Sequence, residues 1–183
     1  MNPLPEEQAG TVQRSRRPRQ LTVTRLIDWR ELRDLRLKAL ADAPSAFGAT
    51  LERELALPQD EWIRRCETSI WSVARISGES VGLACLGRDP SDDHSCRRVF
   101  AMWVRPSARG TSAASSMLQF LLGWASAEGA RKVLLHVAAD NLRAIDLYQR
   151  HGFQPTGRKE RLAGGGSQAA IEMQLSLPDG PAP

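Results

Sequence analysis

The segment VRPSARGTSAA, residues 104–114, joins a strand-like stretch at 97–104 to an amphipathic stretch with helical spacing. The first amide groups of a helix have no partner within the helix and lie at the positive end of its dipole. Small residues at 110 and at 112–114 let a ligand approach this backbone closely. Together with the guanidinium of Arg109, the segment predicts a phosphate-binding turn.

The segment is neither of the commoner nucleotide-binding loops, because it contains neither G-x-x-x-x-G-K-[ST] nor G-x-G-x-x-G. Taken alone, it is equally well explained as an ordinary glycine-containing turn between a strand and a helix. A second distinctive segment, NLRAIDLY at 141–148 followed by Gly152-Phe153, lies further along the chain. Asn141 is suited to cap a helix that Gly152 ends.

The remaining pattern predicts a single α/β domain, which suits a chain of 183 residues. Strands are predicted at residues 21–26, 71–76, 80–86, 97–104, 133–137, 153–158 and 169–176. Helices are predicted from Asp28 to Asp42, after Pro58, from Ala114 to Gly129, and from Asn141 to His151. This order gives a mixed, mostly antiparallel sheet with helices on both of its faces.

Composition excludes several other classes of protein. The 42% hydrophobic and 25% charged residues are ordinary for a globular chain. No apolar run approaches the roughly 20 residues that cross a bilayer, and residues 1–20 lack the apolar core of a secretory signal, so we expect a cytoplasmic protein without a membrane partner. Cys66, Cys85, Cys96 and the three histidines lack metal-ligand spacing, so we predict no metal site.

Charge leaves one further class of partner to consider. The net charge is +4, and several arginines gather at residues 14–19. Nucleic-acid binding through this segment ranks last, because the core lacks the interleaved aromatic and basic residues that such binding uses. We expect residues 1–20 to form a disordered basic arm, 21–176 the domain and 177–183 a tail.

The two quoted segments together resemble those of the GNAT superfamily of N-acetyltransferases. In that family the first reads V-x-P-x-x-R-G-x-G-x-G/A, and the second reads N-x-x-A-I-x-L-Y-x-x-x-G-F. The second segment matches at every one of those positions, and the first has Ser112 where the family favours glycine. The resemblance extends over roughly residues 21–176, because the strand order and the loop at 43–48 are also similar to bacterial members.

The resemblance implies a site for acetyl-CoA as cosubstrate. The amides of residues 109–114 would hold the pyrophosphate, the strand at 102–104 would pair with the pantetheine arm, and Asn141 would bind near the pantetheine. The acetyl thioester would lie where strands 97–104 and 133–137 separate. The implied cofactor-binding residues are Met102, Trp103, Val104, Arg109, Gly110, Thr111, Ser112, Ala113, Ala114 and Asn141.

Acetyl transfer to an amine requires further groups, and the sequence offers candidates for them. The tetrahedral oxyanion needs a donor, which the amide of Val104 could provide. The departing thiolate gains from a nearby acid, and Tyr148, the only tyrosine, occupies the position of the general acid in the family. Core packing is the alternative role for Tyr148. Phe47 and Glu52 are the predicted contacts to the amine.

The general base stays open. Many relatives place a carboxylate about where Arg98 stands in this chain. Other candidates for the general base lie on the loops and on one strand: Glu52, Glu54, Asp92, Asp93 and, through a water molecule, His136. For His136 the alternative is a structural position in the core. The favoured function is acetyl transfer to an amine of a small molecule or peptide. The alternative is a weak or inactive acyl-CoA-binding module of the same fold.

Acceptor specificity is expected in the loops at 42–57, 88–96 and 162–168. The sequence names no acceptor, and it leaves a homodimer open.

Overall fold

The structure analysed is a computed structural model, which describes residues 20–88, 95–161 and 169–178. Residues 1–19 of the predicted basic arm, the acidic pair Asp92 and Asp93, and the loop at 162–168 therefore lie outside the described residues. The boundaries predicted for the arm, domain and tail stay a prediction. Within the described ranges, no helix is both long and apolar enough to span a membrane.

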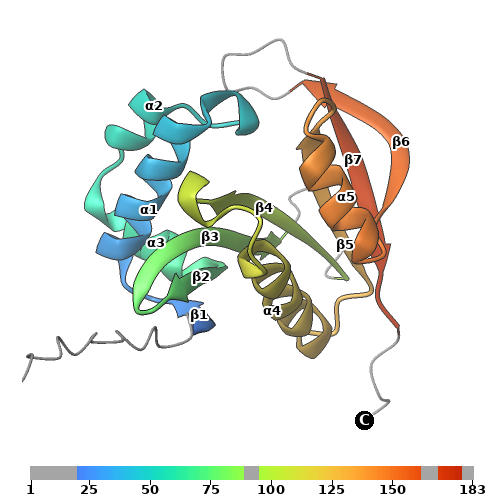
Figure 1. Cartoon of the computed structure of the whole chain (residues 1–183), viewed down its shortest axis with the longest axis horizontal. Coiled ribbons are helices and arrows are strands. Elements are labelled where there is room, and N and C mark those ends of the chain that lie inside the picture. The colour runs from blue at the N-terminus through green and yellow to red at the C-terminus, as the bar shows by residue number, and fades with distance from the viewer. Residues whose placement is uncertain (1–19, 89–94, 162–168, 179–183) are drawn as a thin grey trace, which may run out of the picture.

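Seven strands and five α-helices make up the described chain (Figure 1). The strands are β1 (Leu21–Leu26), β2 (Ile70–Ile76), β3 (Glu79–Arg88), β4 (Cys96–Val104), β5 (Lys132–Ala138), β6 (Gln154–Arg161) and β7 (Ala169–Ser176). The helices are α1 (Trp29–Asp42), α2 (Leu51–Leu55), α3 (Gln59–Thr68), α4 (Ala113–Ala127) and α5 (Leu142–Arg150). All predicted strands and helices are confirmed, with shifts at their ends.

Helix α2 is the one α-helix that the pattern did not predict. It has only five residues, too few to show a helical period, and it begins where the Thr50 hydroxyl accepts a hydrogen bond from the Arg53 amide. Its one buried residue is Glu54, so no apolar stripe marks it in the sequence.

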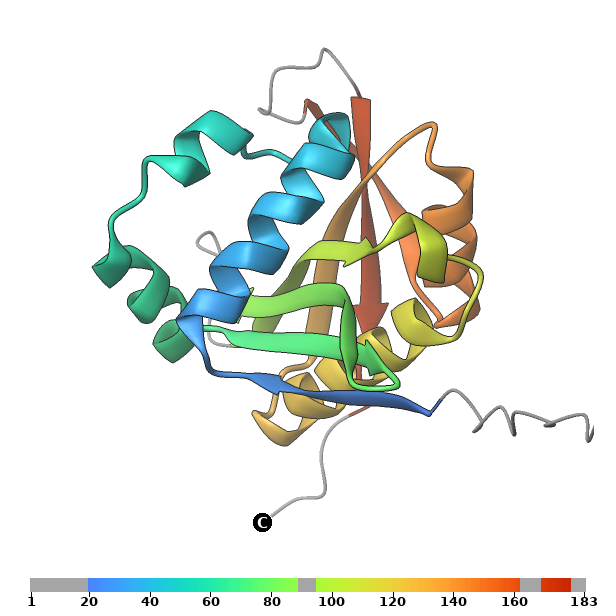
Figure 2. The same ribbon diagram turned by 60° about the vertical axis from the view of Figure 1, so that its left-hand side comes forward.

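The strands form one sheet in the order β1-β2-β3-β4-β5-β7-β6. Every neighbouring pair is antiparallel except β4 and β5, which run parallel. The predicted mixed, mostly antiparallel sheet is therefore confirmed. Figure 2 shows α1 crossing one face of this sheet and α4 lying against the other.

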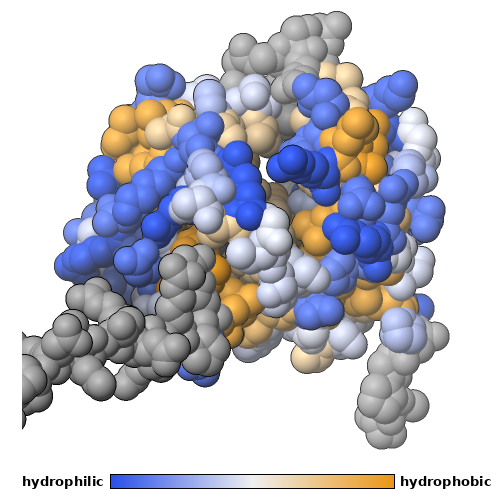
Figure 3. Space-filling model, in the orientation of Figure 1, coloured by the Kyte–Doolittle hydropathy of each residue, from blue (hydrophilic) through white to orange (hydrophobic). Residues whose placement is uncertain are grey.

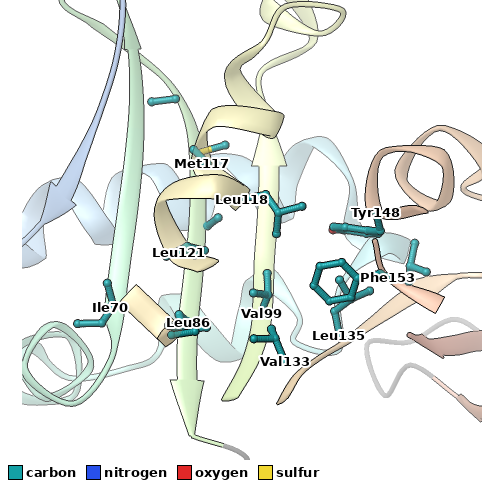
Figure 4. Close-up of a cluster of buried hydrophobic side chains, with 14 of the residues drawn as sticks. Ile70, Leu86, Val99, Met117, Leu118, Leu121, Val133, Leu135, Tyr148 and Phe153 are labelled. Atoms are coloured by element: carbon teal, nitrogen blue, oxygen red, sulfur yellow. The ribbon is translucent and has the colours of Figure 1, made fainter. Parts of the chain in front are cut away.

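Two hydrophobic clusters cover the two faces, because residues in β2 to β4 alternate between them. On one face α4 packs Met117, Leu118 and Leu121 over the sheet, and Tyr148 and Phe153 extend this cluster beside α5 (Figure 4). On the other face α1 and α3 cover a cluster that includes the fully buried Trp62 of α3. The predicted helices on both faces are thus confirmed.

Strands β4 and β5 separate partway along their length. Their register runs from Cys96↔Lys132 to Val99↔Leu135 and then stops. The β4 register against β3 shifts between Leu83 and Cys85, and Ala101 has a φ of 56°. Such a bulge bends a strand and increases its twist, so the end of β4 turns away from β5.

Candidate active site

A cavity of about 1560 Å³ lies where the two strands diverge. One side is built by α1, α2, α3 and the loop at 43–49, and the other by β5, α5 and the start of α4. In the space-filling view a hollow opens near the middle of the molecule, with hydrophilic side chains on both of its sides (Figure 3). The separation expected between the two strands is therefore present, and it is open to ligands.

The end of β4 presents one free backbone amide, that of Val104, to this cavity. The Arg105 amide donates to the Val81 carbonyl, so these two residues form a hydrogen-bonded pair. Because such pairs alternate along an antiparallel ladder, the neighbouring pair of Gly82 and Val104 is not hydrogen-bonded to one another. The Val104 amide therefore points away from β3, toward the side that β5 has left.

The turn before α4 forms one wall of the cavity. A short 3₁₀ turn spans Pro106–Ala108, and α4 begins at Ala113 with Ser112 at its cap position. Four amides here, those of Gly110, Ser112, Ala114 and Ser115, donate to no acceptor in the described part of the chain. A helix start with free amides and a positive dipole end is suited to bind phosphate.

Gly110 keeps this turn accessible. Its φ of 80° lies in the left-handed region, and a Cβ added there would meet no atom within 4 Å. The residue therefore borders open space in the cavity wall, where a larger side chain would occupy room that a ligand needs. The turn thus fits a pyrophosphate.

The guanidinium of Arg109 differs from the expectation. It was predicted to face the phosphates, but its Nε donates to the Val104 carbonyl at 3.1 Å and its Nη2 to the Asp42 carboxylate. Asp42 also accepts a hydrogen bond of 2.9 Å from the Trp103 indole. Asp42 at the end of α1 therefore fixes the turn and β4, a role that the sequence pattern did not reveal.

The same side of the cavity continues at the start of α5. The Asn141 side-chain oxygen caps α5 by accepting from the Ala144 amide at 3.2 Å, and Asn141 lines the cavity. Because the oxygen is used in the cap, the side-chain amide nitrogen is the group left for a ligand. Ser115 of α4 lies 2.8 Å from His151 at the end of α5, and this contact joins the two helices on that side.

Tyr148 lies on α5 and lines the cavity with 5% of its surface exposed. Its ring packs edge-on against Phe153, so core packing and a cavity-facing position are combined in one side chain. Burial raises the pKa of the phenol well above its usual value of 10.0. The hydroxyl consequently stays protonated, as a proton donor must.

The loop and helix candidates for contact with the amine are not all placed in the cavity. Phe47 lines it, but Glu52 is exposed and does not. The helical turn of α2 instead directs Glu54 inward, where its carboxylate pairs with Arg36 and Arg65. The predicted contact of Glu52 with the amine is therefore corrected, because the glutamate of α2 that faces the cavity is Glu54.

His136 lines the cavity, so it is not the enclosed core residue that was the alternative to a general base. Its Nδ1 lies 2.6 Å from Nη1 of Arg98, and its Nε2 lies 3.5 Å from Glu160 and 3.6 Å from Glu172. Because a guanidinium only donates, Nδ1 of neutral His136 must be the acceptor and Nε2 carries the proton toward the two carboxylates. The ring then has no free lone pair.

The other predicted cofactor contacts divide by exposure. Trp103 and Ala113 are buried, with only 6% and 0% of their surfaces exposed, so mainly their backbone groups are available to a ligand. Trp103 also borders the cavity. The remaining ones in the cavity wall are Met102, Val104, Gly110, Thr111, Ser112 and Ala114. In the described ranges no group of three or more His, Cys, Asp or Glu residues has the arrangement of a metal site.

Comparison with known proteins gives concordant results. The match to one curated relative, the uncharacterized N-acetyltransferase YdgE of Bacillus subtilis, is 31% identical over 91 residues. It covers 50% of this chain and 58% of that protein, so it spans little more than half of the relative's length.

Solved structures share the fold at lower identity. An acetyltransferase of the GNAT family from Streptococcus pneumoniae superposes with a TM-score of 0.73 at 20% identity, covering 87% of this chain and 100% of that chain. The yncA protein of Salmonella typhimurium, solved with its cofactor acetyl-CoA, gives 0.70 at 20% identity, with 90% and 98% covered. Residues 29–153 match the profile of the Acetyltransferase (GNAT) family. The chain belongs to this family of acetyltransferases.

Proposed function

We propose that the protein transfers the acetyl group of acetyl-CoA to an amine of a small molecule or peptide. The observation that carries this proposal is one cavity bordered both by unpaired amides at the start of α4 and by the Tyr148 side chain. The first feature suits a pyrophosphate and the second suits a leaving thiolate.

The geometry supports a set of residues as the proposed contacts to acetyl-CoA. The amides of Gly110, Ser112 and Ala114 would bind the pyrophosphate, and Asn141 would donate from its side-chain nitrogen. The edge of β4 up to Val104 would bind the pantetheine arm through main-chain hydrogen bonds, as an added strand does. Acetyl-CoA supplies the activated acetyl group as a thioester.

The proposed reaction forms a C–N bond and breaks a C–S bond. A neutral amine attacks the acetyl carbonyl, and the charge that develops on its oxygen is stabilised by the Val104 amide. The C–S bond then breaks, the electron pair leaves with sulfur, and Tyr148 donates its proton to the thiolate. The amine proton passes to solvent, and the phenol is reprotonated from solvent.

Water is the proposed acceptor of the amine proton. Glu54 is held in two ion pairs, and both nitrogens of neutral His136 are engaged. Arg98, at about the position where many relatives carry a carboxylate, is itself a cation. In the part of the chain that the structure describes, none of the named candidate bases that border the cavity is a free acceptor. We therefore expect the rate to rise with pH as the acceptor amine itself deprotonates.

The test combines turnover with binding. Thiol release from acetyl-CoA is followed against a panel of primary amines, and coenzyme A binding is measured by calorimetry on the same protein. Binding with turnover of at least one amine is expected. Absence of coenzyme A binding would contradict the proposal. Tight binding without any turnover would favour the acyl-CoA-binding module, which the absence of a free acceptor among the named candidate bases Glu54 and His136 also favours.

A further inference from the structure

A cluster of charged side chains borders the cavity on the side built by α1, α2 and α3. Its members are Arg36, Glu54, Glu61, Arg64 and Arg65, and all five line the cavity. Arg36 and Glu54 are 3.2 Å apart, and Arg65 lies 3.1 Å from Glu54 and 3.0 Å from Glu61. We call these five residues the arginine cluster.

Arg36 is the part of the arginine cluster whose hydrogen bonds are incomplete. Its side chain is only 7% exposed, and its Nε and Nη2 both reach Glu54. Its Nη1 is buried and has no hydrogen-bond partner. A buried donor without a partner is costly, and in native proteins it marks a function or a missing ligand.

The charge of the arginine cluster is also unbalanced. Three arginines face two glutamates, so one positive charge is left over. The hydrogen bond from Arg64 lowers the pKa of Glu61, and that carboxylate is therefore ionised at neutral pH. A single anionic group entering the cavity would balance this excess and would supply the acceptor that Nη1 lacks.

We infer that the amine acceptor carries a carboxylate, as a free amino acid or a peptide C-terminus does, and that the arginine cluster binds it. This inference rests on the proposed acetyl transfer and names its substrate class. Arg36 and Arg65 hold the carboxylate, and the amine of the same molecule extends toward the end of β4. The cluster thus selects the acceptor, while the opposite wall holds the acetyl donor.

Phe47 determines how the carboxylate reaches Arg36. Its ring centroid lies 4.8 Å from the guanidinium carbon, and both residues line the cavity. The ring shields the guanidinium, so Nη1 becomes accessible when the ring turns aside. Displacing a cation–π contact by a charge-assisted hydrogen bond favours the bound acceptor.

The test compares amines that differ only in the carboxylate. Amino acids and their primary amides are used in pairs, with thiol release giving kcat/KM for each. We expect kcat/KM to be at least ten-fold higher for the free acid. The comparison is conservative, because the amide has the more easily deprotonated amine and is the better nucleophile at neutral pH. Equal or higher efficiency with the amides would overturn the inference.

Variants show whether the arginine cluster causes the preference. Arg64→Gln and Arg65→Gln should each lower the ratio of acid to amide several-fold, mainly through KM of the acid. Arg53→Gln on α2 removes the same charge from an exposed residue that does not line the cavity, and it should leave the ratio unchanged. Arg36 is not the first choice, since its removal leaves Glu54 buried without that partner.

The outcomes separate this inference from the function on which it rests. Turnover of amines without a carboxylate, together with rejection of their acids, overturns the inference and leaves acetyl transfer intact. An acid preference that survives both Gln variants overturns the assignment to the arginine cluster. Failure of coenzyme A to bind, with no turnover of any amine, overturns both.

Discussion

The phenol of Tyr148 keeps its proton and has no protein group in the described chain to donate it to. Its oxygen has no hydrogen-bond partner among the described residues, although the side chain is 95% enclosed. Burial raises its pKa, so the proton is present across the usable pH range. The oxygen is not among the fully buried polar atoms that lack a partner, so it reaches the cavity, where a thiolate could accept its proton.

Replacing Tyr148 by phenylalanine tests this role. We expect Tyr148→Phe to lower kcat by roughly 10²–10⁴-fold, the range for a positioned acid, because the ring and its packing on Phe153 remain. Coenzyme A affinity and the melting temperature should change little. Near-normal turnover in a stable variant would remove Tyr148 from the mechanism, and a large loss of stability would indicate a structural role.

His151 makes the stability of the fold depend on pH. Burial and the charge of Arg150 lower the pKa of the ring below its ordinary 6.5. The unfolded chain therefore takes up a proton first as the pH falls, and the free energy of unfolding should decrease below about pH 6.5. Denaturant midpoints from pH 7.5 to 5 measure this slope.

The matched variant for this effect is His151→Gln, which keeps a polar partner for Ser115. It should show a shallower decrease across the same pH range. A slope that is equally steep without the imidazole would assign the pH dependence to other groups.

At the scale of elements, the turn between β4 and α4 contributes its backbone and α1 holds that turn in place. The Asp42 carboxylate accepts from both Arg109 and Trp103, so α1, β4 and the turn share one hydrogen-bonded point. A phosphate-binding turn must be preorganised, because ordering it on binding would reduce affinity. Arg109 therefore acts through its position in the turn.

Gly110→Glu tests the turn itself. The side chain would fill the open space beside the free amides, and its charge would repel phosphate, so coenzyme A affinity should fall by at least ten-fold. Gly110→Ala is the control, because it introduces the same left-handed strain of roughly 1–2 kcal/mol without the charge. Calorimetry on both variants separates the two effects. Unchanged affinity in folded Gly110→Glu would place the pyrophosphate elsewhere.

At the scale of the whole molecule, the site lies where two neighbouring strands of one sheet separate. Only the register from Val99↔Leu135 back to Cys96↔Lys132 joins β4 to β5. The α1–α3 side carries the arginine cluster, and the β5–α5 side carries Tyr148 and Asn141. A reaction between two substrates suits this arrangement, because each side can hold one of them.

Removing residues 1–19 tests the predicted boundary of the domain. The first described contact is the Gln20 carbonyl, which accepts from the Ser77 amide, and the described cavity wall begins at Arg36. We expect kcat/KM of the truncated chain to stay within a few-fold of the full chain, with an unchanged melting temperature. Loss of activity in a truncated chain that remains folded would show that the segment belongs to the site.

The sequence by itself determined the elements, together with the turn and the helix cap that border the cavity. Alternation and helical spacing are local properties, so they predicted β1 to β7 and every helix except the five-residue α2. The turn at 104–114 and the cap at Asn141 are equally local, because backbone amides and caps depend on neighbouring residues.

Only the tertiary structure decided which side chains meet around the cavity. Asp42 binds Arg109, and Arg36 binds Glu54, between residues that no short-range pattern connects. The same holds for His136, whose lone pair faces Arg98 of another strand. Long side chains find such partners through the packing of distant elements, and helical phase alone turned Glu54 inward and Glu52 outward. The spacing of residues along the chain therefore does not predict these contacts.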